Sequence, residues 1–301
     1  MNEIKQRLKS SRNWLGLIEE LEAEADKLTD REEKSRRLYA LGQACEQLFL
    51  RKDKAMVNYQ KAFKLFPQNV RPLERARLIY HEMGNLKMVA KLMDFQLKVV
   101  SDASERARLL TQLAFTFIDL RQLDGARAKL NEAHTCDANA EGLDEAIATV
   151  SYDPSAWEPV INALSQQAEV ATGEVRARLL VRAARIYCLQ APEEPAREAL
   201  LRDAVEADPQ NDVANFLLES LLAEQGRTAE IVAVHEGRVA AAREDARARL
   251  YQHLASLWAI RFVDVGTTAA FYERALRAFY EQGADAFAGH LAAFNFLREV
   301  W

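Results

Sequence analysis

The chain repeats itself every 71 residues, and this period constrains its fold more than any other feature of the sequence. Alanine occupies the same position in four copies, and a tyrosine or a leucine stands three residues before each alanine. The four pairs are Tyr59 with Ala62, Leu130 with Ala133, Leu201 with Ala204 and Tyr272 with Ala275. A fixed period of this kind is typical of repeat proteins, in which each unit buries its apolar face against the next.

Within each unit the apolar residues recur at steps of three and four, as in Leu110, Leu113, Ala114 and Phe117, which indicates α-helices. Only 11 Gly and 7 Pro occur among 301 residues, so few positions would break a helix. We expect helices at 14–28, 33–48, 53–66, 70–83, 86–99, 104–120, 123–137, 140–151, 155–170, 174–189, 193–207, 212–225, 228–242, 244–262, 266–281 and 284–300. The expected caps are Asp102 or Ser104, Thr172, Asp212 and Thr267 at N-termini, and Gly84 and Gly226 at C-termini.

Half of 71 is close to 35 residues, so the elementary unit is expected to be a hairpin of two helices. The best copies carry a small residue midway along the first helix, namely Gly42, Ala114 or Ala184, and the paired alanines on the second helix. In this pattern residues 33–281 resemble the tetratricopeptide repeat (TPR), strongly in alternate hairpins and weakly between them. The resemblance implies an all-α, right-handed superhelical solenoid of about seven hairpins, whose first helices line a concave groove.

We interpret residues 1–301 as a single solenoid domain of this kind, preceded by an extension at 1–13. Its four units, each of two hairpins, are expected near 14–85, 86–156, 157–227 and 228–298. The chain has no run of 18 uncharged apolar residues, and its polar N-terminus does not look like a signal peptide. The three cysteines are odd in number and far apart, which does not suggest disulfides. A cytoplasmic location without membrane contact is therefore expected.

The charge is distributed unevenly along the chain. Residues 1–100 hold 20 Lys and Arg against 14 Asp and Glu, whereas residues 101–301 hold 20 against 31. A basic end on an acidic body could steer an acidic partner, although local bias on a solvated surface would give the same counts. The acidic body disfavours nucleic-acid binding, because RNA-binding repeats need a basic track for the phosphates.

The sequence contains no phosphate-binding loop, serine nucleophile elbow, zinc-protease motif or calcium loop. Its five histidines are scattered, and only His134 lies near a cysteine, Cys136, so neither a metal nor a cofactor is expected. We therefore expect no enzymatic activity. The leading hypothesis is a protein–protein interaction scaffold that binds a peptide or a partner's helix in the groove. The alternatives are a single-stranded RNA-binding repeat and a subunit that regulates or positions an enzyme encoded elsewhere.

Arginine recurs near the start of the first helix of each unit, where the resemblance implies the edge of the groove. These arginines are Arg36, Arg108, Arg178 and Arg249. They could grip carboxylates of a partner, or they could form pairs along their own helices, such as Glu174 with Arg178 and Asp245 with Arg249. The other candidate groove residues are Gln43, Thr111, Phe115, Arg182, Arg185, Gln252 and Ser256. Phe115 either anchors a peptide or packs against neighbouring helices.

The expected last helix, 284–300, lacks the polar outer face with which solenoids normally end. Residues 251–301 hold 11 of the 25 aromatic residues. We expect an inward seam through Phe287, Leu291, Phe294 and Trp301, which would leave Phe296 on another face. The segment either folds inward around a compact end or forms a homodimer with a second copy, and the candidate contacts are Phe287, Phe294, Phe296 and Trp301.

Overall fold

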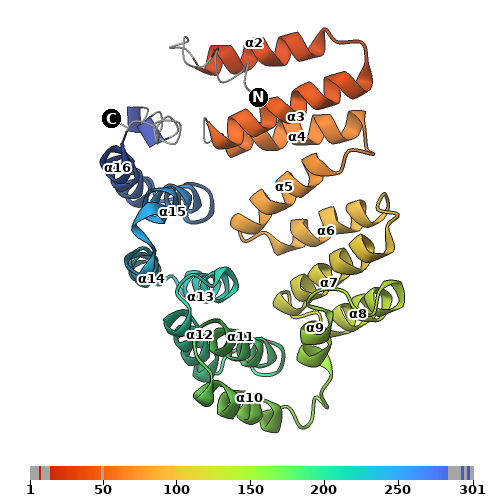
Figure 1. Cartoon of the computed structure of the whole chain (residues 1–301), viewed down its shortest axis with the longest axis vertical. Coiled ribbons are helices and arrows are strands. Elements are labelled where there is room, and N and C mark those ends of the chain that lie inside the picture. The colour runs from red at the N-terminus through yellow and green to blue at the C-terminus, as the bar shows by residue number, and fades with distance from the viewer. Residues whose placement is uncertain (1–6, 8–13, 49–50, 284–292, 295–296, 299–301) are drawn as a thin grey trace. The chain divides into compact units, whose positions relative to one another are not determined.

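The computed structural model describes residues 7, 14–48, 51–283, 293–294 and 297–298, and these residues contain α-helices and no strand (Figure 1). The helices are α2 (Trp14–Asp26), α3 (Arg31–Gln47), α4 (Lys52–Leu65), α5 (Arg71–Glu82), α6 (Leu86–Leu97), α7 (Ala103–Asp119), α8 (Leu123–Cys136), α9 (Leu143–Val150), α10 (Glu158–Val170), α11 (Gly173–Gln190), α12 (Pro195–Ala207), α13 (Asp212–Glu224), α14 (Thr228–Ala241), α15 (Glu244–Leu257) and α16 (Val265–Gln282). The predicted all-α architecture of consecutive helices is confirmed. No helix within these ranges has both the length and the apolar character that crossing a membrane requires.

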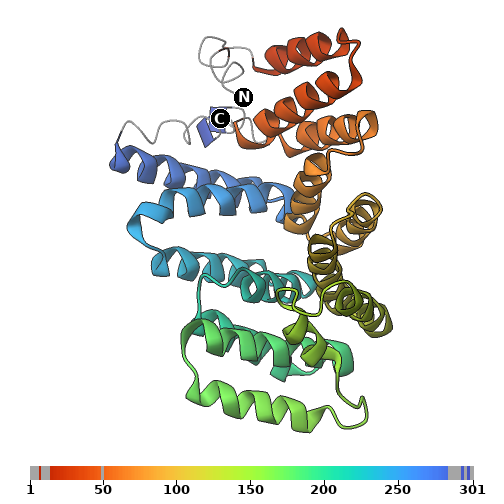
Figure 2. The ribbon, with the colours of Figure 1, turned by 45° about the vertical axis from the view of Figure 1, so that its right-hand side comes forward.

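Tight and loose packing alternate along the chain. The most extensive helix–helix contacts join α3 to α4, α7 to α8, α11 to α12 and α15 to α16. Each of these pairs is an antiparallel hairpin, as the blue ribbons of α15 and α16 illustrate in Figure 2. By contrast, α5 with α6 and α9 with α10 make few contacts. The alternation has the same period as the sequence repeat.

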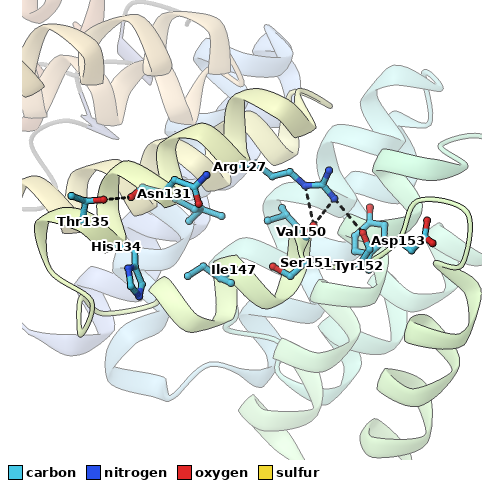
Figure 3. Close-up of a pocket in the computed structure, with 10 residues that line it drawn as sticks. Arg127, Asn131, His134, Thr135, Ile147, Val150, Ser151, Tyr152 and Asp153 are labelled. Atoms are coloured by element: carbon cyan, nitrogen blue, oxygen red, sulfur yellow. Dashed lines mark hydrogen bonds between the residues drawn. The ribbon is translucent and has the colours of Figure 1, made fainter.

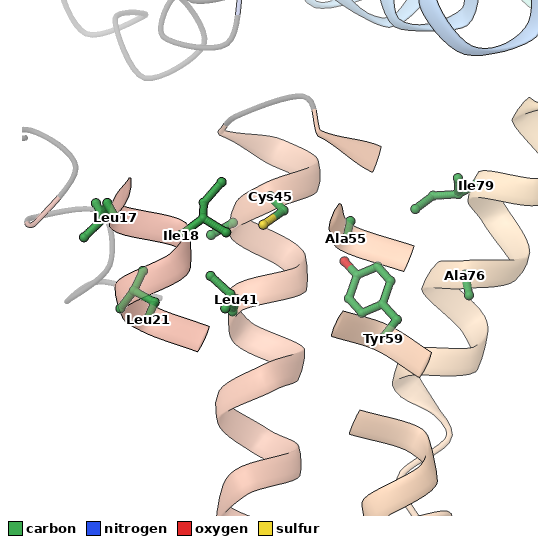
Figure 4. Packing of buried hydrophobic residues seen from close by; sticks show 10 residues of the cluster. Leu17, Ile18, Leu21, Leu41, Cys45, Ala55, Tyr59, Ala76 and Ile79 are labelled. Atoms are coloured by element: carbon green, nitrogen blue, oxygen red, sulfur yellow. The ribbon is translucent and has the colours of Figure 1, made fainter. Parts of the chain in front are cut away.

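The repeated residues lie at the centre of the tight hairpins. All four alanines of the repeat are completely buried, and the tyrosine or leucine before each is at most 2% exposed. In the first hairpin Tyr59 lies between α3, which carries Leu41 and Cys45, and α5, which carries Ile79 (Figure 4). A Cβ atom at Gly42 would come within 2.6 Å of Cε1 of the Tyr59 ring. The 71-residue period is therefore a period of core packing.

A buried carboxylate completes this first hairpin. The Tyr59 hydroxyl donates to Oε2 of Glu46 at 2.6 Å, and Nε of Arg75 donates to the same oxygen at 3.2 Å. Burial, followed by the hydrogen bond to Glu46, raises the pKa of Tyr59, so the phenol stays protonated. Burial also raises the pKa of the neighbouring Cys45 to about 12, which keeps its sulfur a thiol with little nucleophilic character.

The predicted N-terminal caps are correct at one position and displaced at others. Asp102 accepts a hydrogen bond from the Glu105 N–H at 2.8 Å, as expected. Asp212 is not a cap, because it is the first residue of α13, and Asn211 before it accepts a hydrogen bond from the Ala214 N–H at 3.0 Å. Thr267 is not a cap either, because it lies inside α16, and its N–H donates to Asp264 at 2.6 Å. Thr172 stands at the start of α11, but its side chain makes no capping bond.

Left-handed residues terminate several helices. Gly84 and Gly226 adopt φ angles of +72° and +69°, which confirms their expected role. The predicted helix 244–262 is found with these bounds, but α15 ends at Leu257 and the last five residues, Trp258–Phe262, form a π-helical turn. Val263 then adopts a φ of 53°, a conformation that costs roughly 1–2 kcal/mol for an ordinary L-residue. No glycine or proline marks this break in the sequence.

The chain packs into two compact units. One consists of Met1–Leu92 with Arg243–Trp301, and the other consists of Met93–Ala242. Their two boundaries fall inside α6, after Leu92, and between α14 and α15, after Ala242, and neither is one of the expected unit boundaries. The interpretation of 1–301 as one solenoid domain, its four unit bounds and the superhelical handedness remain predictions.

Near the C-terminus only a few residues are described. Phe294 is 59% exposed, whereas Ala293 and Leu297 are buried. The inward seam predicted through Phe294 is therefore wrong at that residue. The buried positions are instead Ala293, one residue before it, and Leu297, three residues after it. Phe287, Leu291, Phe296 and Trp301 lie outside the described residues, and self-association through this segment remains a prediction.

Candidate interaction surfaces

Two of the predicted groove arginines lie exposed on packed first helices of the unit Met93–Ala242. Arg108 belongs to α7 and Arg178 to α11, and these two helices contact each other. Neither guanidinium forms an ion pair with a described carboxylate, and in particular the expected pair with Glu174 does not form. Their charges are therefore not neutralised within the described part of the chain.

In the other unit, the two remaining arginines of this set are also exposed. Arg36 lies 3.6 Å from Glu32 on its own helix, a pair that is worth little at the surface. Arg249 is exposed, and its expected partner Asp245 instead contacts Arg243 at 3.1 Å. The expectation of a pair along the helix is thus wrong at Arg249.

Three of the predicted groove residues are buried. Thr111 is 2% exposed, and its hydroxyl donates to the Ala107 carbonyl at 2.9 Å. Ser256 is 7% exposed and hydrogen-bonds to Tyr272, and Arg185 is 8% exposed. Sequence spacing identified the face of each helix but not whether a neighbouring hairpin covers that face. As placed here, these three side chains belong to the packing of the hairpins and not to an open surface.

Arg185 joins α11 to α7. Its Nε and Nη2 donate to Oδ1 and Oδ2 of Asp119 at 2.8 and 2.9 Å, and both side chains are nearly buried. The guanidinium also stacks 4.6 Å from the centroid of the Phe115 ring. Phe115 is half-buried in this arrangement, which favours its role in packing over that of a free anchor. A planar guanidinium can satisfy both contacts at once.

Two further arginines hold the end of α9, a helix of only eight residues. Arg182 donates to the Ala148 carbonyl at 2.6 Å, and burial lowers the pKa of its guanidinium. Arg127 reaches across from α8 and donates to the Val150 carbonyl at 2.8 Å and to the Tyr152 carbonyl at 3.2 Å (Figure 3). The last carbonyl groups of a helix have no hydrogen-bond donor within the helix. Arg127 and Arg182 supply such donors at the end of α9.

An open cleft of about 800 Å³ lies between α8 and the second half of α9 together with the residues that follow it (Figure 3). Leu130 and Val150 form its buried apolar floor. Its polar lining consists of Arg127, Asn131, His134, Thr135, Ser151 and Asp153. A cleft with an apolar floor and hydrogen-bonding groups of both kinds can accept a side chain of a protein or peptide.

Two of the remaining predicted residues, Gln43 and Gln252, are half-buried. Gln43 donates to the Tyr39 hydroxyl at 3.1 Å, which ties it to its own helix. Within the described residues, no three or more His, Cys, Asp or Glu side chains gather in a group that could hold a metal ion. The buried histidine that sequence analysis did not single out, His235, lies 2.9 Å from Glu219 in the core between α13 and α14.

No family model matches the sequence, and it has no significant match among curated proteins. Among solved structures, the chain is similar to the TPR domain of P58(IPK), with 12% sequence identity. The similarity covers 99% of both chains, and the TM-score is 0.23. The architecture assigned to this chain therefore rests on its own helices and on the burial of its repeated residues.

Proposed function

We propose that the chain is a non-catalytic scaffold that binds a peptide or a helix of a partner protein. The observation that carries this proposal is the pair of exposed, unneutralised arginines on α7 and α11, Arg108 and Arg178. A guanidinium binds a carboxylate through two parallel hydrogen bonds, so the pair would favour a partner with acidic side chains.

The packing around these arginines supports the proposal. Arg185 fastens α11 to α7 through Asp119, and Arg182 fastens α11 to the end of α9. Because the helices that carry the exposed arginines are firmly joined, their backbone needs little ordering when a partner binds, which favours affinity. The buried arginines thus act as the framework for the exposed ones.

We also propose a cytoplasmic location, since Cys45, Cys136 and Cys188 are free thiols.

Affinity purification from the native cell, followed by mass spectrometry, tests this function. We expect a specific protein to be recovered with the wild-type chain, and its recovery to fall about tenfold with Arg108→Glu combined with Arg178→Glu, because two contacts to carboxylates become repulsive. The variants Arg108→Glu and Arg178→Glu are also made singly. The control for each of them is Arg277→Glu, which reverses the charge of an exposed arginine on α16.

Recovery of no protein above background across several conditions would contradict the proposed function, as would recovery of RNA alone. If the recovered protein is an enzyme, a change in its rate on addition of the purified chain would indicate regulation, and an unchanged rate at saturation would indicate a passive scaffold.

A further inference from the structure

One position of the 71-residue repeat differs in kind from its counterparts. Seven residues before each repeated alanine stand Ala55, Ala126, Arg197 and Thr268. All four are buried, and Arg197 is 5% exposed. The third repeat therefore places a guanidinium at a position where the core of the other repeats holds a small side chain. Because arginine does not lose its proton in proteins, the charge remains when the side chain is buried.

Arg197 also differs from the other buried arginines of its compact unit. Arg185 pairs with Asp119, and Arg238 pairs with Asp212. Arg197 forms no side-chain hydrogen bond and no ion pair with any described residue, and its Nη1 is sealed from solvent without a partner. All residues of this unit are described. A buried charge without a partner is strongly destabilising, so an anion supplied by a ligand would relieve it.

The place of Arg197 in its helix also favours an anion. Arg197 is the third residue of α12, which begins at Pro195. Glu194, at the N-cap position, makes no side-chain capping bond. Side chains of a helix lean toward its N-terminus, so the guanidinium adds to the partial positive charge of this end. The first turn of α12 thus combines a helix N-terminus with a buried cation that lacks a partner.

The neighbouring carboxylates restrict the kind of anion. Glu198, the next residue, already pairs with two other arginines. Glu193 and Glu194 are exposed just before α12, and neither forms an ion pair with Arg197. Their two negative charges would repel a multiply charged anion such as phosphate more than a singly charged one. A carboxylate carries one charge and matches a guanidinium through two parallel hydrogen bonds.

We propose that Arg197 and the first turn of α12 bind the carboxylate group of a ligand. The guanidinium donates hydrogen bonds to the carboxylate oxygens, and the positive end of the helix adds to the attraction. The carboxylate belongs either to a small organic acid or to a side chain of a partner protein. The site shares no residue with Arg108 and Arg178, so this proposal does not depend on the proposed function.

Thermal unfolding of the full chain, with acetate as the probe, tests this proposal. At neutral pH, replacing about 100 mM chloride by acetate should raise the melting temperature by about 2 °C, since a ligand that binds only the folded chain stabilises it. The same exchange should leave the melting temperature of Arg197→Met unchanged, because methionine keeps an apolar stem and removes the charge. The control is Arg277→Met, which removes an exposed arginine of α16 and should keep the shift.

Without acetate, the paired and the unpaired buried arginine should respond in opposite directions. Arg197→Met should raise the melting temperature by about 2 °C or more, since it removes a buried charge that has no counterion. Arg185→Met should lower the melting temperature, since it leaves Asp119 unpaired. A lower melting temperature of Arg197→Met would show that the guanidinium already has a partner in the fold, and it would overturn the proposal.

Two peptides distinguish the sources of the carboxylate and need no variant. One is a short peptide with an amidated C-terminus and a single central glutamate, and the other has glutamine in its place. A shift with acetate alone assigns the site to a small organic acid, whereas a shift with the glutamate peptide and not with the glutamine peptide assigns it to a protein side chain. The absence of any shift in the wild-type chain contradicts the proposal. A larger shift with phosphate than with acetate, or equal acetate shifts in the wild-type chain and Arg197→Met, contradicts it as well.

Discussion

Replacing Arg185 by alanine should lower the free energy of unfolding by about 3–5 kcal/mol, because Asp119 would be left buried without a counterion. The substitution also removes the guanidinium that stacks on Phe115. Urea unfolding followed by far-ultraviolet circular dichroism measures the loss. The control is Arg178→Ala on the same helix, whose exposed side chain has no ion-pair partner among the described residues, and it should change stability by less than about 0.5 kcal/mol.

A compensating double variant separates loss of the pair from loss of packing. Arg185→Met combined with Asp119→Leu removes both charges and keeps apolar volume, so it should regain most of the lost stability. If the free energy of unfolding of Arg185→Ala instead lies within about 1 kcal/mol of the wild-type value, the ion pair between α7 and α11 does not stabilise the fold as proposed.

Replacing Gly42 by alanine should destabilise the chain by about 1–3 kcal/mol, because the new Cβ would stand 2.6 Å from the Tyr59 ring. The ring has little room to move, since it is 1% exposed and its hydroxyl is bound to Glu46. The same unfolding experiment measures the effect. Gly237→Ala is the matched control, because Gly237 lies in α14 and a Cβ added there would meet nothing within 4 Å, so it should stabilise by up to about 1 kcal/mol through helix propensity.

Replacing the opposing Tyr59 ring by a smaller side chain should restore part of the stability that Gly42→Ala loses. Tyr59→Leu in the Gly42→Ala background leaves room for the methyl group, and leucine is the residue that the second and third repeats carry at this position, as Leu130 and Leu201. The rescue would be incomplete, because the hydrogen bond to the buried Glu46 is lost. An unchanged stability of Gly42→Ala would show that the close approach of the two helices is not needed.

The helices and the core positions of this chain could be predicted from sequence because they depend on local spacing. The residues at Tyr59, Ala62 and their counterparts are buried in all four repeats, as the 71-residue period indicated. The π-helical turn at Trp258–Phe262 could not be predicted, since no helix-breaking residue precedes Val263.

The candidate site was less predictable because burial depends on partners far away in sequence. Arg185 and Asp119 are 66 residues apart, and Arg127 reaches carbonyl groups 23 and 25 residues further along the chain. A helical period shows which side chains share a face, but it does not show which of them another hairpin will cover. Arg178 and Arg185 lie on the same helix, and only the packing with α7 makes the first exposed and the second buried.

The central claim is that the chain works by holding another protein on its exposed first-helix positions. Hydrogen–deuterium exchange of the chain, alone and with the protein recovered by affinity purification, tests this claim most directly. We predict that the bound partner slows exchange at the starts of α7 and α11, around Arg108 and Arg178, while exchange in the hairpins α3–α4 and α15–α16 is the same in both states. Identical exchange in these two segments with the partner demonstrably bound would contradict the claim.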